Sequence, residues 1–177
     1  MSAPPSSLVQ ETPEERVGRL FLAHHQRLYR LALRLSSGSD DARDLVQETF
    51  LRAARRPGSV PAGEPGGEAW LVRVLVNLAR DRHRRRAVRE RAQAWLRPGP
   101  TTTASHEGAA IAADQVREAL ARLSPRRRAV LVMAELEELG TLEIARLLGI
   151  AQASVRWHRA QARRALARHL AEAVETK

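Results

Sequence analysis

Apolar residues recur at three- and four-residue steps in successive segments of the 177-residue chain, and no segment alternates apolar and polar residues as a half-buried strand would. The first segment follows Thr12-Pro13-Glu14-Glu15, which combines a capping box with proline at the first helical position. Its apolar face is expected to run from Val17 through Leu20 and Phe21 to Leu35, and Ser37-Gly38 predicts its end. This periodicity predicts an all-α fold.

A second helix and a loop are expected to follow. Ser39 is predicted to cap a helix whose apolar positions run from Ala42 to Ala53, and Pro57 is predicted to end it. Residues 56–68, RPGSVPAGEPGGE, are dense in proline and glycine and should not continue a helix. We therefore expect an exposed loop there.

The third helix is expected to be long and to change in character along its length. From Ala69 an apolar face resumes, and it continues without a breaker into a stretch with seven arginines between Arg80 and Arg91. A charge run alone usually marks a solvated face, and Trp70 is expected in the core. The position of the run, beside a glycine-rich loop and an apolar helix, nevertheless suits contact with unstacked single-stranded bases.

The chain is expected to form two small helical domains. Residues 97–110, RPGPTTTASHEGAA, lack periodicity and have the composition of a flexible linker. This linker would separate a first domain, residues 12–96, from a second, residues 111–172. Residues 1–11 are rich in proline and serine and are expected to be disordered.

The second domain contains a helix-turn-helix pattern. Ser124-Pro125 is predicted to cap one helix, and TLEIARLLGIAQASVRWHRAQARRAL predicts a short helix, a tight turn at Gly149 and a longer arginine-rich helix. In this layout the second helix of the pair enters the major groove of DNA. Candidate DNA contacts on it are five arginines and several polar residues: Arg156, Arg159, Arg163, Arg164, Arg168, Gln152, Ser154 and Gln161.

Composition favours a polyanionic partner, either nucleic acid or an acidic membrane surface. The chain has 30 Lys plus Arg against 20 Asp plus Glu, a net charge of +10 that favours a polyanion. Lys177 is the single lysine, so nearly all the positive charge is guanidinium, which pairs with phosphate bidentately. Without cysteine the chain can form neither a disulfide nor a thiolate metal site. No secretory start or membrane-length apolar run is visible, which predicts a cytoplasmic protein.

Three segments resemble the extracytoplasmic-function (ECF) sigma factors of bacterial RNA polymerase. Residues 41–50 carry the motif D-x-x-D-L-V-Q-E-T-F of the first conserved domain of that family. WLVRVLVNLARDRHRRR, from Trp70, is similar to its promoter-melting helix, and residues 123–166 are similar to its second domain. Two positions depart from the family pattern: Arg159 stands where an apolar residue is usual, and Trp157 where a small polar residue is usual.

The resemblance implies a transcription initiation factor without catalytic residues, cofactor or metal of its own. Its partners would be the largest and second-largest subunits of core RNA polymerase, promoter DNA and an anti-sigma factor. The first domain would bind the polymerase through Asp41, Asp44, Gln47 and Glu48. It would bind the melted minus-ten element through Asn77, Arg80, Arg84 and Arg85. The second domain would bind the minus-thirty-five element through Gln152, Ser154, Arg156, Trp157 and Gln161.

Three other interpretations are open to the residues alone. A membrane-surface helix is disfavoured, because the Arg80 to Arg91 segment lacks a wide Trp, Phe or Leu face opposite its charges. An ordinary helix-turn-helix regulator would explain the second domain but not the motif at residues 41–50. In an enzyme, some of the six histidines would serve as metal ligands or bases, but the sequence contains no H-E-x-x-H pattern and no phosphate-binding glycine loop. Adjacent His24 and His25 are expected to point to different parts of a helix. The absence of such motifs disfavours catalysis.

Overall fold

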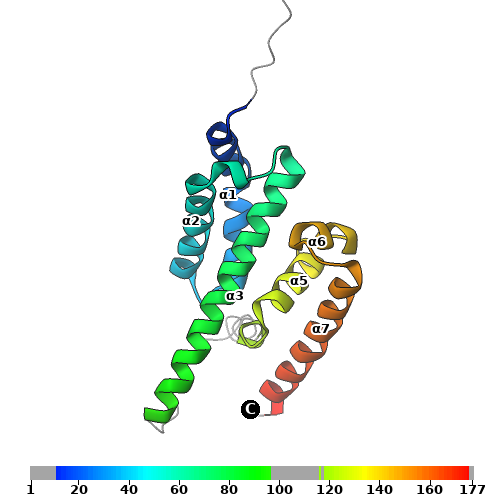
Figure 1. Ribbon diagram of the computed structural model, residues 1–177. Coiled ribbons are helices and arrows are strands. Elements are labelled where there is room, and N and C mark those ends of the chain that lie inside the picture. Colours follow the sequence, from blue (N-terminus) through cyan, green and yellow to red (C-terminus); the bar gives the residue numbers. More distant parts are fainter. Residues whose placement is uncertain (1–10, 97–115, 117, 176–177) are drawn as a thin grey trace, which may run out of the picture.

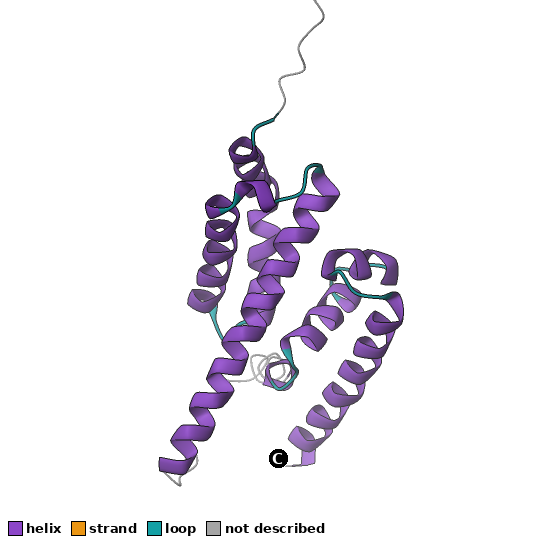
Figure 2. Ribbon diagram, viewed as in Figure 1, coloured by secondary structure: helices purple, strands orange, loops and turns teal. Residues whose placement is uncertain are grey.

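The computed structural model describes residues 11–96, 116 and 118–175. Every regular element in these residues is a helix, as the periodicity predicts (Figures 1 and 2). Apart from Glu11, the segments expected to be disordered, residues 1–11, and to form a linker, residues 97–110, lie outside the described residues. The elements are α1 (Pro13–Leu35), α2 (Ser39–Arg55), η1 (Pro57–Ser59), α3 (Glu64–Leu96), α5 (Pro125–Glu135), α6 (Thr141–Leu148) and α7 (Gln152–Glu175).

The start of α1 is the predicted capping box. The backbone N–H of Thr12 donates to Glu15 Oε2 at 2.9 Å, and the backbone N–H of Glu15 donates to Thr12 Oγ1 at 3.2 Å. Two N–H groups that a helix start leaves unpaired are thereby satisfied. The buried face of α1 contains most of the predicted apolar residues, namely Leu20, Leu28, Leu31, Ala32 and Leu35, and the helix ends at Leu35.

Two predictions about helix starts are corrected. The cap of α2 is Gly38, not Ser39, which is already the first helical residue, and no side chain caps this end. Acidic residues in the first turn, Asp40 and Asp41, complement the helix dipole there instead. Ser124 does occupy the predicted cap position of α5, with Pro125 after it, but its side chain makes no capping hydrogen bond.

The loop predicted for residues 56–68 is shorter than expected, because α3 begins at Glu64 and includes the last five of these residues. Proline is tolerated in a first helical turn, where its missing N–H has no partner to lose. A Cβ on Gly67 would lie 2.8 Å from Leu20 Cδ1, so this glycine allows α3 to approach α1 closely. The remaining loop is not wholly exposed, since Val60 is buried and its carbonyl accepts from Arg16 Nη1 at 2.9 Å.

The helices form two bundles that share one apolar core. Helices α1, α2 and α3 pack together as an N-terminal half, and α5, α6 and α7 as a C-terminal half (Figure 1). Helix α5 also packs against α1 and α3, and α6 packs against α3. The larger apolar cluster therefore runs through both halves and includes Leu28, Leu45, Leu75, Val130, Met133, Ile144 and Val155.

Arg128 lies buried where the two halves meet. Its Nη1 donates to the carbonyl of Leu35 at 3.0 Å, and its Nη2 donates to the carbonyls of Ala121 at 2.7 Å and Leu123 at 3.3 Å. Burial lowers the pKa of Arg128 to about 10, so the guanidinium remains charged at neutral pH. A second contact between the halves is the ion pair of Arg27 Nη2 with Glu137 Oε2 at 3.1 Å.

Truncation of Leu75 tests the shared core. Leu75 is fully buried in α3, so Leu75→Ala should lower the free energy of unfolding by about 2–5 kcal/mol in urea denaturation followed by circular dichroism. The control is Leu22→Ala, because Leu22 is 78% exposed on α1 and its truncation should change that free energy by less than about 0.5 kcal/mol. Equal losses in the two variants would contradict the placement of the core.

Candidate nucleic-acid and protein interfaces

Helices α6 and α7 form the predicted helix-turn-helix. Gly149 follows α6 in the left-handed conformation, with φ 62° and ψ 43°, which glycine adopts at little cost. The N–H of Ile150 then donates to the carbonyl of Ala145 at 3.0 Å, which closes the helix end. Ile144, Leu148 and Val155 are buried between the two helices and fix their relative placement.

The predicted minus-thirty-five residues all lie in the first half of α7, but they differ in exposure. Gln152, Arg156 and Trp157 are exposed, whereas Ser154 and Gln161 are half-buried. The buried side of α7 is formed by Val155, Ala162 and Ala165. At 3.6 residues per turn, Arg156 and Trp157 fall on the side of the helix away from these residues. This is the side that a DNA groove could contact.

Trp157 is held by a residue that the sequence did not single out. Its side chain is 52% exposed, and Arg127 Cζ of α5 lies 5.4 Å from the indole centroid, within cation–π range. The His158 ring meets the indole edge-on, with centroids 5.0 Å apart. Burial, with Arg126 and Arg127 nearby, lowers the pKa of His158, which keeps the imidazole neutral at pH 7. No local pattern links α5 to Trp157, so sequence reasoning could not find Arg127.

Arg159 is accommodated by an ion pair with α5. Its Nε donates to Glu135 Oε1 at 2.8 Å, and Arg163 donates to the same carboxylate through Nε at 3.0 Å and Nη2 at 2.9 Å. These two guanidinium groups lower the pKa of Glu135 to about 2, the Arg163 hydrogen bonds being the largest cause. A charged pair therefore occupies the contact between α5 and α7 where an apolar side chain was expected.

The basic part of α3 has two differently oriented sets of side chains. The predicted minus-ten residues Asn77, Arg80, Arg84 and Arg85 are all exposed. The helical period places the first three in one stripe and Arg85 about 100° around the helix from Arg84. Arg82 points instead to α2, where its Nη1 donates to the carbonyl of Asp41 at 3.2 Å. Figure 1 shows the end of α3 projecting beyond α1 and α2.

The predicted polymerase-binding residues form an acidic and polar strip on α2. Asp41, Asp44 and Gln47 are exposed, and Glu48 is half-buried and accepts from Arg52 Nε at 3.0 Å. Asp44 Oδ2 lies 3.9 Å from Arg82 Nη1 of α3. The strip is therefore accessible to a partner along most of its length.

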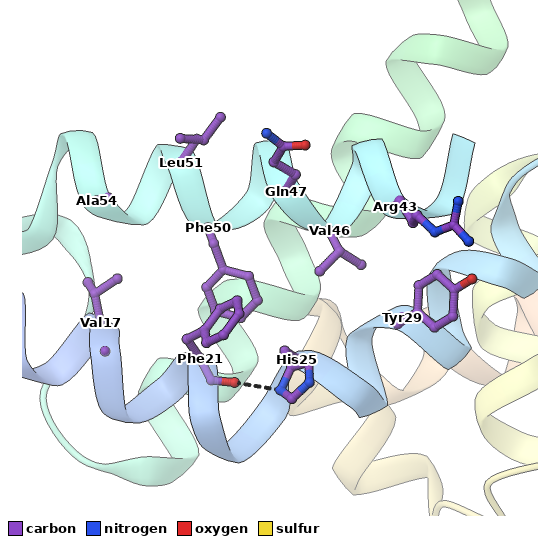
Figure 3. Close-up of a pocket in the computed structure, with 11 residues that line it drawn as sticks. Val17, Phe21, His25, Tyr29, Arg43, Val46, Gln47, Phe50, Leu51 and Ala54 are labelled. Carbon is purple, nitrogen blue, oxygen red and sulfur yellow. Dashed lines mark hydrogen bonds between the residues drawn. The ribbon is translucent and has the colours of Figure 1, made fainter. Parts of the chain in front are cut away.

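Beside this strip lies an apolar groove between α1 and α2 (Figure 3). Phe21 is 45% exposed in it, although its spacing had placed it with the core residues of α1. Its ring packs edge-on against Phe50, with centroids 4.9 Å apart, and stacks on His25 at 5.0 Å. The groove also contains Gln47, so the polar strip and the groove form one continuous surface. The spacing of apolar residues along a helix does not by itself predict which of these residues remains exposed.

The histidines do not assemble a metal site within the described part of the chain, where no group of three or more His, Cys, Asp or Glu residues is placed to hold a metal. His24 Nε2 lies 2.9 Å from Glu64 Oε2, whereas His25 Nδ1 donates to the carbonyl of Phe21 at 3.1 Å. Among the same described residues, none of the helices has the length and apolar character needed to cross a membrane.

Comparison with known proteins identifies the family. Residues 20–89 match the family model of Sigma-70 region 2, and residues 113–166 match that of Sigma-70 region 4. SigM of Mycobacterium tuberculosis (strain H37Rv), an ECF RNA polymerase sigma factor, is 37% identical over 153 residues, which cover 86% of this chain and 76% of SigM. SigE of Mycolicibacterium smegmatis, of the same family, is 37% identical over 164 residues; the match covers 86% of this chain but only 62% of SigE.

Solved structures share the fold. The sigma factor RpoE from Bartonella quintana, solved with the anti-sigma factor NepR, superposes with a TM-score of 0.64 at 25% identity, covering 88% of this chain and 97% of RpoE. CnrH, solved with the cytosolic domain of CnrY, has the same fold, with a TM-score of 0.60 at 23% identity over 88% of each chain. Fold, family models and relatives agree, and the chain belongs to the ECF sigma factors, a class of transcription initiation factor.

The Glu135 ion pair predicts a pH dependence. Because the folded-state pKa of Glu135 lies below its ordinary value of 4.5, the pair contributes fully to stability above about pH 4.5 and is lost as the pH falls toward 2. The difference in melting temperature between the wild type and Glu135→Gln should therefore shrink across that range. A difference that stays constant from pH 6 to about pH 2.5 would contradict the pairing.

Proposed function

We propose that the chain binds core RNA polymerase and directs it to promoters, with residues 12–96 serving the polymerase and the minus-ten element and residues 111–172 serving the minus-thirty-five element. The observation that carries this proposal is that one chain combines a helix-turn-helix exposing Arg156 and Trp157 with a separate basic helix, α3. A plain helix-turn-helix regulator would not require the basic helix α3 in addition to the helix-turn-helix. The family of the chain supports the same conclusion.

The polymerase contact would use the α2 strip and the neighbouring groove together. Asp41, Asp44, Gln47 and Glu48 would face a clamp helix of the largest subunit, and further contacts would reach the second-largest subunit. An exposed aromatic ring beside charged residues is typical of a protein interface, since aromatic side chains supply much of the binding energy there. Phe21 fits that description in the groove.

The minus-ten contact would use the exposed basic stripe of α3. Asn77, Arg80 and Arg84 share one stripe, which suits a single strand that follows the helix. Arg85, further around the helix, would contact the phosphate backbone. The chain itself would perform no chemistry: it would lend binding energy to the opened promoter, and the polymerase would supply catalysis.

An anti-sigma factor is a further proposed partner. RpoE, which this chain resembles over 88% of its length, was solved with the anti-sigma factor NepR. Such a partner would cover the polymerase-binding surface and act in the cytoplasm, where the polymerase works. The exposed groove beside Phe21 offers an apolar surface for it.

The packed arrangement of the two halves would have to open on a promoter. A Cβ on Gly149, at the turn before α7, would lie 3.0 Å from Arg73 Cδ of α3. The two DNA-binding surfaces are thus within roughly 30 Å of each other, given a rise of about 1.5 Å per helical residue. Promoter elements about 25 base pairs apart are separated by roughly 85 Å at about 3.4 Å per base pair. Because this separation exceeds the distance between the two surfaces, the packed chain would not reach both elements, and the two halves would have to move apart.

Distance measurement tests this opening. The chain has no cysteine, so Ala23→Cys on α1 and Ala167→Cys on α7, both exposed positions, provide two labelling sites. Energy transfer between dyes at these sites should be efficient in the free protein and should fall strongly in the complex with polymerase and promoter. Unchanged transfer in an active promoter complex would contradict the opening.

Two charge reversals test the division of labour. Asp44→Arg should abolish co-elution with core polymerase and spare binding of the isolated protein to duplex DNA, because Asp44 is 65% exposed on the α2 strip. Arg156→Glu should spare co-elution with core polymerase and abolish binding to duplex DNA. Loss of both activities in each variant would indicate misfolding or a wrong assignment, and melting curves by circular dichroism distinguish the two.

A further inference from the structure

Glu135 is the last residue of α5, and it engages two arginines of the recognition helix α7. Three hydrogen bonds of 2.8–3.0 Å join its two carboxylate oxygens to Arg159 and Arg163. These arginines are four residues apart and therefore lie one above the other on the same side of α7. The geometry is that of a carboxylate clamped between two guanidinium groups.

Arg159 and Arg163 are close to the surface proposed to meet DNA. The helical period places Arg163 about 20° from Arg156 around α7, and Arg159 about 60° from it. Arg163 is exposed and Arg159 half-buried, so both could reach a phosphate at the edge of a major groove if their donors were available. Three of these donors, Arg159 Nε and Arg163 Nε and Nη2, are directed instead at Glu135, and a phosphate would have to compete with that carboxylate for them.

We propose that Glu135 is a specificity-determining residue, which withholds Arg159 and Arg163 from the DNA backbone and leaves recognition to Arg156 and Trp157. The inference rests on the proposed function of α7 as a DNA-binding helix. Contacts to phosphate raise affinity for every sequence equally, whereas contacts to base edges discriminate between sequences. A chain with a net charge of +10 gains little selectivity from two more phosphate contacts.

The same helix, α5, also contacts Trp157, the exposed aromatic residue of the recognition helix. Arg127 lies over the Trp157 indole at 5.4 Å, so its guanidinium is also directed at the protein. Arg127 and Glu135 belong to one helix and contact side chains that lie within two turns of each other on α7. Helix α5 therefore determines which side chains α7 offers to a groove.

The experiment measures how the affinity of the full chain for a non-promoter duplex depends on salt. Each phosphate neutralised by an arginine steepens the plot of log K against log[salt] by about 0.9. Glu135→Gln should release up to two arginines and steepen the slope by roughly 1–2 relative to the wild type. The matched control is Glu138→Gln: it removes the same charge three residues later, at an exposed residue just after α5. This control should leave the slope unchanged.

A second variant keeps the test independent of how Glu135→Gln folds. The double variant Arg159→Gln/Arg163→Gln should have the wild-type slope, because both arginines are already withheld from phosphate. Adding Glu135→Gln to this double variant should also leave the slope unchanged. A shallower slope in the double variant, or equal slopes for Glu135→Gln and Glu138→Gln, would overturn the inference while leaving the proposed function intact. Failure of the wild type to bind any duplex would overturn both.

Discussion

The arrangement of the whole molecule depends on how Arg128 is accommodated. A guanidinium buried in an apolar core is costly unless its donors are paired. Here three backbone carbonyls accept from Nη1 and Nη2 of Arg128, while its Nε is buried without a hydrogen-bond partner among the described residues. One of them belongs to Leu35, the last residue of α1, where the helix dipole favours a cation. Arg128 thus ties α5 to α1 across the junction, and the position of α5 in turn sets that of α6 and α7.

Contacts from helix α5 accommodate both residues at which the recognition helix departs from the family pattern. Trp157 stands where a small polar residue is usual, and Arg127 covers one side of its ring. Arg159 stands where an apolar residue is usual, and Glu135 pairs with it. Both departures are therefore compensated from the same helix. A bulky aromatic ring is presented to solvent, and two arginines are turned back toward the protein, so the surface that α7 offers is smaller and less basic than its sequence suggests.

The sequence predicted what local signals determine. The capping box at Thr12, the left-handed turn at Gly149 and the unbroken apolar pattern after Ala69 each specify their element from neighbouring residues, and the structure has all three. Long-range packing was not predictable in this way. Gly67 is typical of a loop by its sequence context, yet it lies in α3, where its missing Cβ leaves room for Leu20 of α1. For the candidate sites, helical spacing predicted that Asp44, Arg80 and Arg156 are exposed, but not the groove beside Phe21 or the residues of α5 that act on α7.

Reconstituted transcription tests the central claim most directly. Purified protein would be combined with core RNA polymerase and a pool of templates with randomised upstream sequence, and the transcribed templates would be sequenced. The account predicts initiation that depends on this protein, from templates enriched in two separate sequence elements, one near minus ten and one near minus thirty-five. Failure to associate with core polymerase, together with retained affinity for duplex DNA, would contradict it and indicate a helix-turn-helix regulator instead.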